Sequence, residues 1–343
     1  MSVRDRHQGR AVAGIVGFGT YTPQDRVSAA ELARQAGVPV ERFTRGIGFE
    51  HVHVAGDDEH PSTMGLAAAR EAVAEAGLTG EDLDLVIFVS AGDYDYRNWC
   101  PSTSIVRELG CHHAYSFEVR NGCAGGVLAC NVAAGMMDRD PSVNNALIVC
   151  ADTLSRIVSP EIPECHPLLY FGDGAAAVVL RRDHPRYQLL SFAEHTDGDL
   201  GDLLRIDAGG TRLPFTKDFD DWDRAYARVD AEVFADLIDR VYLNEYVSVI
   251  NRAVQRSGHA LAEMDFILMN QVKASLREHI LETIAMPQDH TYISLDEYGH
   301  MGPADSLFTM AMAHRDGLLP EGKLAILASS GLGFSWVASV LRC

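Results

Sequence analysis

The segment Arg120–Gly126, with the sequence RNGCAGG, places a cysteine between glycines at the predicted junction of a strand and a helix. We expect a strand over Tyr115–Val119 and an Ala- and Gly-rich helix over Ala124–Met136, so Cys123 stands at a helix N-terminus. Unpaired N–H groups and the helix dipole stabilise a thiolate there and lower the pKa of the thiol. The pattern predicts a nucleophile, and a small buried cysteine in a tight turn is the alternative.

The glycines around this cysteine also indicate how a substrate could bind. Because glycine has no side chain, it allows a substrate to approach the backbone closely. The N–H groups at the start of the helix can also hold the oxyanion that forms during acyl transfer. We therefore expect acyl chemistry if the cysteine is reactive.

Composition limits the class of protein around this site. The 343 residues are 47% hydrophobic and 22% charged, which indicates a folded globular chain of about two domains. With 48 acidic and 29 basic residues the net charge is -19, which disfavours a nucleic acid partner. No apolar run approaches the ~18 residues of a membrane span. The seven cysteines form no CxxC pair and the charged N-terminus lacks the apolar core of a signal peptide, so we predict a cytoplasmic protein without a metal.

Short apolar runs alternate with helical segments along the chain. One clear amphipathic helix is expected over Ser62–Gly77, with serine at its start and glycine at its end. This alternation predicts an α/β fold with a largely buried sheet. The predicted strands of the first half are Ala11–Gly19, Leu85–Ser90, Ala146–Ala151 and Ala175–Leu180.

The second half of the chain repeats features of the first half in the same order. Four such matches indicate an internal duplication of roughly 170 residues, with halves at 1–185 and 186–343 packed face to face. The acidic and aromatic region Asp197–Tyr226 lacks periodicity, and we expect a loop or cap over the site. The matching pairs include Leu83–Phe88 with Met264–Met269, and Asn145–Ala151 with Lys323–Ser329.

Four ordered motifs carry a resemblance to a known family. They are RNGCAGG, Tyr170–Leu180 (YFGDGAAAVVL), Tyr298–Ser306 (YGHMGPADS) and Ser330–Arg342 (SGLGFSWVASVLR). Together they resemble the ketoacyl-acyl-carrier-protein synthase III branch of the thiolase superfamily, from about Gly14 to the end of the chain. The resemblance implies an α/β thiolase fold of five layers (αβαβα) built from two duplicated halves, a homodimer, and an acyl intermediate on Cys123.

Two positions depart from the pattern of the condensing members, which carry a histidine in an HQAN motif and an asparagine in a YGN motif. Here the first position holds Asn270 and the second holds His300. Decarboxylative condensation needs neutral donors that stabilise an enolate. Transfer to an alcohol, amine or thiol instead needs a base, which His300 is by type. Asn270 either keeps an auxiliary donor role through its amide or has no role.

Asp305 follows His300 by five residues, across Gly302 and Pro303. A carboxylate there can hydrogen-bond the imidazole, fix its tautomer and raise its basicity, so that Cys123, His300 and Asp305 form a catalytic triad. Aspartate is also favoured at a helix N-cap, and a helix over Ser306–His314 is expected directly after it, so capping is the alternative.

The resemblance also implies where the oxyanion and the acyl donor bind. The N–H of Cys123, together with that of Leu332 or Gly333, would hold the oxyanion. Arg45 lies near the phosphate-contacting arginine of the family. The tryptophan that stacks on adenine in typical members is not evident near Arg42, which leaves a carrier protein as an alternative donor to coenzyme A.

This set of residues resembles a divergent subgroup of synthase III-like acyltransferases in natural-product pathways, antibiotic biosynthesis among them. We predict an enzyme that moves a short acyl group from acyl-CoA or an acyl carrier protein, through acyl-Cys123, onto a hydroxyl, amine or carrier thiol in secondary metabolism. No bound cofactor is expected. The alternatives are a decarboxylative condensing synthase and a non-catalytic partner subunit.

Overall fold

The computed structural model describes residues 13–230, 232–233, 237, 241–331 and 333–343. Its strands are β1 (Ala13–Tyr21), β2 (Arg26–Ser28), β3 (His51–His53), β4 (Leu85–Val89), β5 (Tyr115–Val119), β6 (Asn145–Thr153), β7 (Asp173–Arg182), β8 (Gln188–Thr196), β9 (Phe266–Met269), β10 (Leu324–Gly331) and β11 (Ser335–Arg342). Its helices are α1 (Ala29–Ala36), α2 (Glu41–Thr44), α3 (Pro61–Glu75), α4 (Pro101–Leu109), α5 (Gly125–Arg139), α7 (Leu243–Ser257), α8 (Ala274–Thr283), α9 (Leu295–Tyr298) and α10 (Asp305–Arg315).

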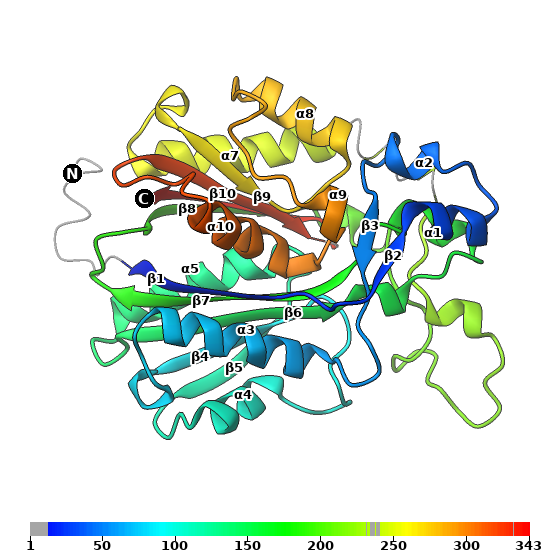
Figure 1. Cartoon of the computed structure of the whole chain (residues 1–343), viewed down its shortest axis with the longest axis horizontal. Coiled ribbons are helices and arrows are strands. Elements are labelled where there is room, and N and C mark those ends of the chain that lie inside the picture. The colour runs from blue at the N-terminus through cyan, green and yellow to red at the C-terminus, as the bar shows by residue number, and fades with distance from the viewer. Residues whose placement is uncertain (1–12, 231, 234–236, 238–240, 332) are drawn as a thin grey trace.

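The elements stack in five layers (Figure 1). One half-sheet contains β1 and β4 to β7, and the other contains β8 to β11. Helices α5 and α10 lie between the half-sheets, while α3 and α4 cover the outer face of the first and α7 and α8 cover the outer face of the second. This is the αβαβα order of the predicted thiolase fold, which is confirmed.

The two half-sheets repeat one pairing pattern. In the first, β4 pairs with β6 in parallel, and β7 pairs antiparallel with both β6 and β1. In the second, β9 pairs with β10 in parallel, and β11 pairs antiparallel with both β10 and β8. A single Cα pair, Gly14 with Gln188, joins them into one nine-stranded sheet. The repeat agrees with an internal duplication, and the boundary predicted between residues 185 and 186 stays a prediction.

Strand β4 shows why the sheet is built from nearly continuous apolar sequence. All five of its residues, LVIFV, are buried, because helices cover both faces of the sheet. Ile87 faces the central core with α5 and α10, whereas Val86 faces the outer core with α3. The same division holds for β10, where Leu327 faces the central core and Ile326 faces the outer core with α7.

Helix α3 lies so close to β1 that two positions of the strand have no room for a side chain. A Cβ atom at Gly17 would lie 2.1 Å from the carbonyl oxygen of Ala72, and one at Gly19 would lie 1.9 Å from that of Ala68. Glycine therefore lets the backbone of the strand touch the backbone of the helix.

The predicted elements and the observed ones agree in type, and their ends differ by a few residues. The strand expected over Ala11–Gly19 is β1, Ala13–Tyr21, and the first two predicted residues lie outside the described part of the chain. The region Asp197–Tyr226 is mainly loop with two short 3-10 helices, as expected, but none of its residues lines the pocket around Cys123. Among the helices of the described residues, none has the length and apolar character that a membrane span requires.

The contact between β1 and α3 generates a stability prediction. We expect Gly19→Ala to lower the free energy of unfolding by about 1–3 kcal/mol, because the added Cβ overlaps the Ala68 carbonyl. Gly135, an exposed glycine in α5 with no atom within 4 Å of a Cβ, is the control, since Gly135→Ala should stabilise the helix by up to about 1 kcal/mol. Urea denaturation of the two variants measures both effects, and equal midpoints would contradict the packing argument.

Candidate active site

Cys123 lies in the tight turn between β5 and α5, two residues before the helix begins, as predicted. Gly122 enables the turn with a left-handed backbone, at φ 51°. The side chain is buried, with 4% of its surface exposed, and it lines a pocket of about 420 Å³. The cysteine is therefore presented to a cavity at the start of a long helix.

The glycines that follow Cys123 have a different role from the predicted one. A Cβ at Gly125 would lie 2.6 Å from Cγ1 of Val89, and one at Gly126 would lie 2.4 Å from the carbonyl oxygen of Pro303. These two glycines make room for protein neighbours, so the expectation that they admit substrate is wrong. They let the first turn of α5 rest against the 3-10 turn Gly302–Ala304, which follows His300.

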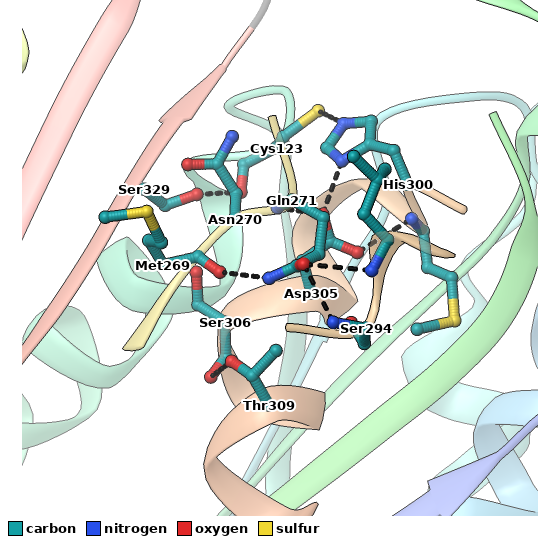
Figure 2. A network of polar contacts seen from close by, with 12 residues as sticks. Cys123, Met269, Asn270, Gln271, Ser294, His300, Asp305, Ser306, Thr309 and Ser329 are labelled. Carbon is teal, nitrogen blue, oxygen red and sulfur yellow. Dashed lines mark hydrogen bonds and ion pairs between the residues drawn. The ribbon is translucent and has the colours of Figure 1, made fainter. Parts of the chain in front are cut away.

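The structure brings together all three residues of the predicted triad (Figure 2). Nε2 of His300 lies 3.0 Å from Sγ of Cys123. Nδ1 of His300 is hydrogen-bonded to a carboxylate oxygen of Asp305 in a very short contact. His300 is 4% exposed and Asp305 is fully buried. The geometry is that of a nucleophile, a base and an orienting carboxylate.

The electrostatics of His300 depend on its two partners. Burial on its own would lower the pKa of the imidazole, but the charges of Asp305 and Cys123 and the hydrogen bonds to both outweigh it and raise the pKa well above 6.5. The raised pKa favours the protonated ring, which places a positive charge beside the sulfur of Cys123.

Backbone donors fix the carboxylate of Asp305. The N–H of Met301 donates to Oδ1 over 2.8 Å, and the N–H of Gln271 donates to Oδ2 over 2.7 Å. Asp305 is the first residue of α10, and all the recorded bonds of its carboxylate lead to His300, Met301 and Gln271. The alternative reading as a helix cap is therefore wrong.

Gln271 is a supporting residue that the sequence analysis missed. Its Oε1 accepts hydrogen bonds from the N–H groups of Ser294 and Leu295, each over 3.0 Å, and its Nε2 donates to the carbonyl of Met269 over 3.1 Å. One side chain thus ties the end of β9 to the segment that leads into His300 (Figure 2). The available signal was its position directly after a buried strand and beside Asn270.

The motif that begins at Tyr170 holds His300 from the other side. The N–H of His300 donates to the carbonyl of Tyr170 over 2.8 Å, and the carbonyl of His300 accepts from Gly172 over 3.0 Å. The rings of Tyr170 and Phe171 pack 5.7 and 5.4 Å from the imidazole. A Cβ at Gly172 would lie 2.5 Å from the carbonyl oxygen of Tyr298, so this glycine allows the two segments to lie in contact.

Asn270 lines the same pocket as Cys123 and His300. Its Oδ1 accepts hydrogen bonds from the hydroxyl of Tyr246 over 2.9 Å and from the N–H of Ser330 over 3.1 Å. Within the described residues its recorded hydrogen bonds do not include Cys123 or His300. Asn270 is thus part of the pocket wall beside the triad.

The structure describes two of the three residues whose N–H groups were predicted to bind the oxyanion. A Cβ on Gly331 would lie 2.9 Å from the backbone nitrogen of Cys123, so a glycine at 331 keeps the space beside that N–H open. Ser329 fixes the same turn, because its hydroxyl donates to the carbonyl of Cys123 over 2.8 Å. Leu332 lies outside the described residues, and Gly333 has φ 85° without lining the pocket.

Two exposed cations, Arg42 and Lys273, line the pocket where it opens to the surface. Arg45, the predicted donor-binding residue, is the exposed C-cap of α2 and is absent from the pocket lining. The apolar part of the lining comes from Ile47, Leu168, Phe171, Val272, Leu276 and Phe334. The cavity therefore combines an apolar interior, a buried triad and a cationic rim.

Two family models match the chain. The model described as 3-oxoacyl-[acyl-carrier-protein] synthase III matches residues 117–198, which include Cys123. The model of the C-terminal region of the same enzyme matches residues 254–343, which include His300 and Asp305.

Curated relatives carry a matching description over nearly the whole chain. The β-ketoacyl-[acyl-carrier-protein] synthase III of Roseiflexus castenholzii is 28% identical over 331 residues, 96% of this chain and 98% of the relative. That of Rhizorhabdus wittichii is 29% identical over 331 residues, 96% of this chain and 99% of the relative.

Solved structures share the fold. The 3-oxoacyl-[acyl-carrier-protein] synthase III from Aquifex aeolicus matches with a TM-score of 0.85 at 23% identity, over 96% of this chain and all of that chain. The priming β-ketosynthase of the R1128 polyketide pathway matches with a TM-score of 0.83 at 21% identity, over 97% of this chain and 96% of that chain. The chain is thus a member of the 3-oxoacyl-[acyl-carrier-protein] synthase III family of the thiolase superfamily.

Proposed function

We propose that this protein is an acyltransferase that moves a short acyl group from an acyl thioester, through acyl-Cys123, onto a hydroxyl, amine or carrier thiol. The observation that carries the proposal is a histidine base within 3.0 Å of the nucleophile, held by a buried carboxylate. This base stands where condensing members have an asparagine. We assign the reaction to secondary metabolism on the sequence resemblance to natural-product acyltransferases.

In the first half-reaction the Cys123 thiolate attacks the carbonyl carbon of the thioester. The N–H of Cys123 donates a hydrogen bond to the developing oxyanion. As the tetrahedral intermediate collapses, the carbon–sulfur bond to the donor breaks. The proton on Nε2 of His300 passes to the departing thiol, which leaves neutral acyl-Cys123 beside a neutral imidazole.

In the second half-reaction the acceptor enters beside His300. Its nucleophilic atom attacks the acyl carbon while its proton passes to Nε2. Asp305 stabilises the imidazolium that forms, since its carboxylate bonds to Nδ1. The Cys123 thiolate then leaves, and the resting ion pair is restored.

The cations at the rim of the pocket favour an acyl donor that carries negative charge. Arg42 and Lys273 are exposed there on a chain whose net charge is -19. A phosphate of coenzyme A or of the pantetheine arm of a carrier protein would find local cations at this opening. We therefore propose both coenzyme A and a carrier protein as acyl donors. Arg45, next to this rim, stays a predicted contact of the donor. Because the reaction needs a reduced thiol, we place it in the cytoplasm.

A decarboxylative condensing reaction is the second candidate, because the relatives that span 96% of the chain are named β-ketoacyl-[acyl-carrier-protein] synthase III. Asn270 supports it as a neutral donor in the pocket. His300 favours transfer instead, since its raised pKa suits proton transfer rather than a neutral donor role. A non-catalytic subunit is disfavoured, because it would have no use for a hydrogen-bonded triad.

We further propose a homodimer joined at β5. This strand is the edge of the nine-stranded sheet, and its Tyr115 is 66% exposed and packs on Phe117. An open edge with an exposed aromatic ring favours pairing with a second chain.

Acylation of Cys123 is the first expected outcome. Incubation with acyl pantetheine thioesters should add the mass of one acyl group to the wild-type chain and none to Cys123→Ala, measured by intact-mass spectrometry. Cys100, the exposed cysteine, supplies the control, because Cys100→Ala should acylate like the wild type. An adduct that survives in Cys123→Ala would remove the nucleophile from the scheme. Release of carbon dioxide from a malonyl thioester with a carbon–carbon product would favour condensation.

Substitution of the orienting carboxylate should impair transfer more than folding. Asp305→Asn removes the charge that raises the pKa of His300 and disturbs the tautomer, so the transfer rate from preformed acyl-enzyme should fall by about 10³-fold or more. The pH at which the acceptor is half-maximally reactive should shift to lower values, since the pKa of the imidazole falls. Asp289→Asn, at an exposed position, is the matched control. An unchanged rate and pH profile in Asp305→Asn would contradict the triad.

Light scattering during size-exclusion chromatography measures the proposed assembly. We expect twice the monomer mass of 37.4 kDa for the wild type. Tyr115→Asp should shift the mass toward the monomer because it places a charge on the β5 edge. A monomeric wild type would rule out the dimer.

A further inference from the structure

Three polar side chains lie together on one wall of the pocket: Tyr242, Asn270 and Ser330. Tyr242 directly precedes α7, Asn270 follows β9, and Ser330 is in β10. All three are buried, with exposed fractions of 8%, 3% and 4%. In the view of Figure 2, Asn270 and His300 lie on either side of the Cys123 side chain.

The amide of Asn270 has one defined orientation. Its Oδ1 already receives two donors, the hydroxyl of Tyr246 and the N–H of Ser330. The NH₂ group must therefore be the end that faces Ser330 Oγ, at 3.4 Å, and the cavity. The pocket wall presents a donor at this point rather than an acceptor.

A count of hydrogens shows that the wall has one hydrogen-bond donor to spare. Asn270 Nδ2 carries two hydrogens, and the hydroxyls of Tyr242 and Ser330 carry one each. Burial raises the pKa of Tyr242 to about 12, so its hydroxyl keeps its proton at neutral pH. The bond from Asn270 to Ser330 uses one hydrogen and the bond between Tyr242 and Ser330 uses a second. Asn270 also donates to the hydroxyl of Tyr242, which uses the second amide hydrogen, so one hydroxyl hydrogen remains without an acceptor among these three residues.

Ser330 is close to the position of a bound acyl group. The residues on either side of it both touch the backbone of Cys123: the hydroxyl of Ser329 bonds to its carbonyl, and Gly331 lies against its nitrogen. Successive side chains of a strand point to opposite faces, so the side chain of Ser330 points away from these two contacts, but it lines the same pocket as Cys123. A chain attached to Sγ would extend into the pocket that Tyr242, Asn270 and Ser330 also line.

We infer that Tyr242, Asn270 and Ser330 form a donor site for an oxygen that the acyl group carries beyond its thioester carbonyl. The inference rests on the proposed acyl-Cys123 and names its substrate class: thioesters with a 3-hydroxy or 3-oxo group. An alkyl chain would cover this hydrogen without supplying an acceptor, and a buried donor left unpaired is unfavourable. The site contains no cation, so a neutral oxygen suits it better than a carboxylate.

Acylation rates of matched substrates measure this preference. Butyryl, 3-hydroxybutyryl and 3-oxobutyryl pantetheine have the same carbon chain, and pantetheine is common to coenzyme A and carrier proteins. Each rate of adduct formation, from rapid quench and intact mass, is divided by the rate of the same thioester with free cysteine. We expect both oxygenated substrates to exceed butyryl by about tenfold, the effect of one hydrogen bond.

Two variants assign the preference to this wall. Tyr242→Phe and Ser330→Ala should each reduce the ratio of oxygenated to butyryl rates toward one. Tyr187→Phe is the matched control, because Tyr187 is also buried and bonds through its hydroxyl to His314, yet does not line the pocket. It should keep the wild-type ratio.

The outcomes separate the two proposals. If wild-type Cys123 is acylated by all three thioesters at equal normalised rates, the donor site is overturned while the acyl-cysteine stands. If Tyr242→Phe and Ser330→Ala both keep the wild-type ratio, the preference comes from elsewhere and the assignment is equally overturned. If none of the three thioesters forms an adduct, the proposed function itself fails, and with it the inference.

Discussion

The contact between Cys123 and His300 unites two halves of a duplicated chain. The two side chains are 177 residues apart in sequence and 3.0 Å apart in space. Each is buried, so a charge on either side chain is poorly screened by solvent. The imidazole can exchange a proton with the sulfur only if its ring is held toward it. Several contacts in the surrounding structure hold the ring in this orientation. Asp305 binds the ring, Gln271 ties the adjacent loops together, and the segment at Tyr170 holds the backbone of His300.

The layered fold explains how such a pair can be buried without losing alignment. Helix α5 begins at the nucleophile and lies in the central layer, and α10 begins at Asp305 in the same layer. The starts of these two helices therefore meet next to the pocket, and the positive end of α10 lies beside the carboxylate of Asp305. The half-sheets on either side fix the two helices, which makes the catalytic arrangement a consequence of packing across the whole molecule.

Some residues of the site could be predicted from the local sequence, and others could not. Cys123 could be predicted because a strand, a glycine turn and a helix follow one another in the sequence around it. His300 and Asp305 were recognised through family motifs, and their contact follows from a spacing of five residues across a turn. The contacts of Gln271, Tyr242 and Ser330 could not be predicted, because they depend on partners from distant segments. The use of Gly125 and Gly126 was wrongly predicted for the same reason, since Val89 and Pro303 approach them only in three dimensions.

The backbone contact between Gly126 and Pro303 has a consequence for how this family can change over evolution. It holds the turn that follows His300 against the first turn of α5 through main-chain atoms. Mutations at lining residues that do not hold His300, such as Leu276 and Phe334, can then alter which molecules fit while Cys123 and His300 keep their alignment. A lineage with this architecture can explore new substrates by drift at the pocket wall, with little risk to the chemistry.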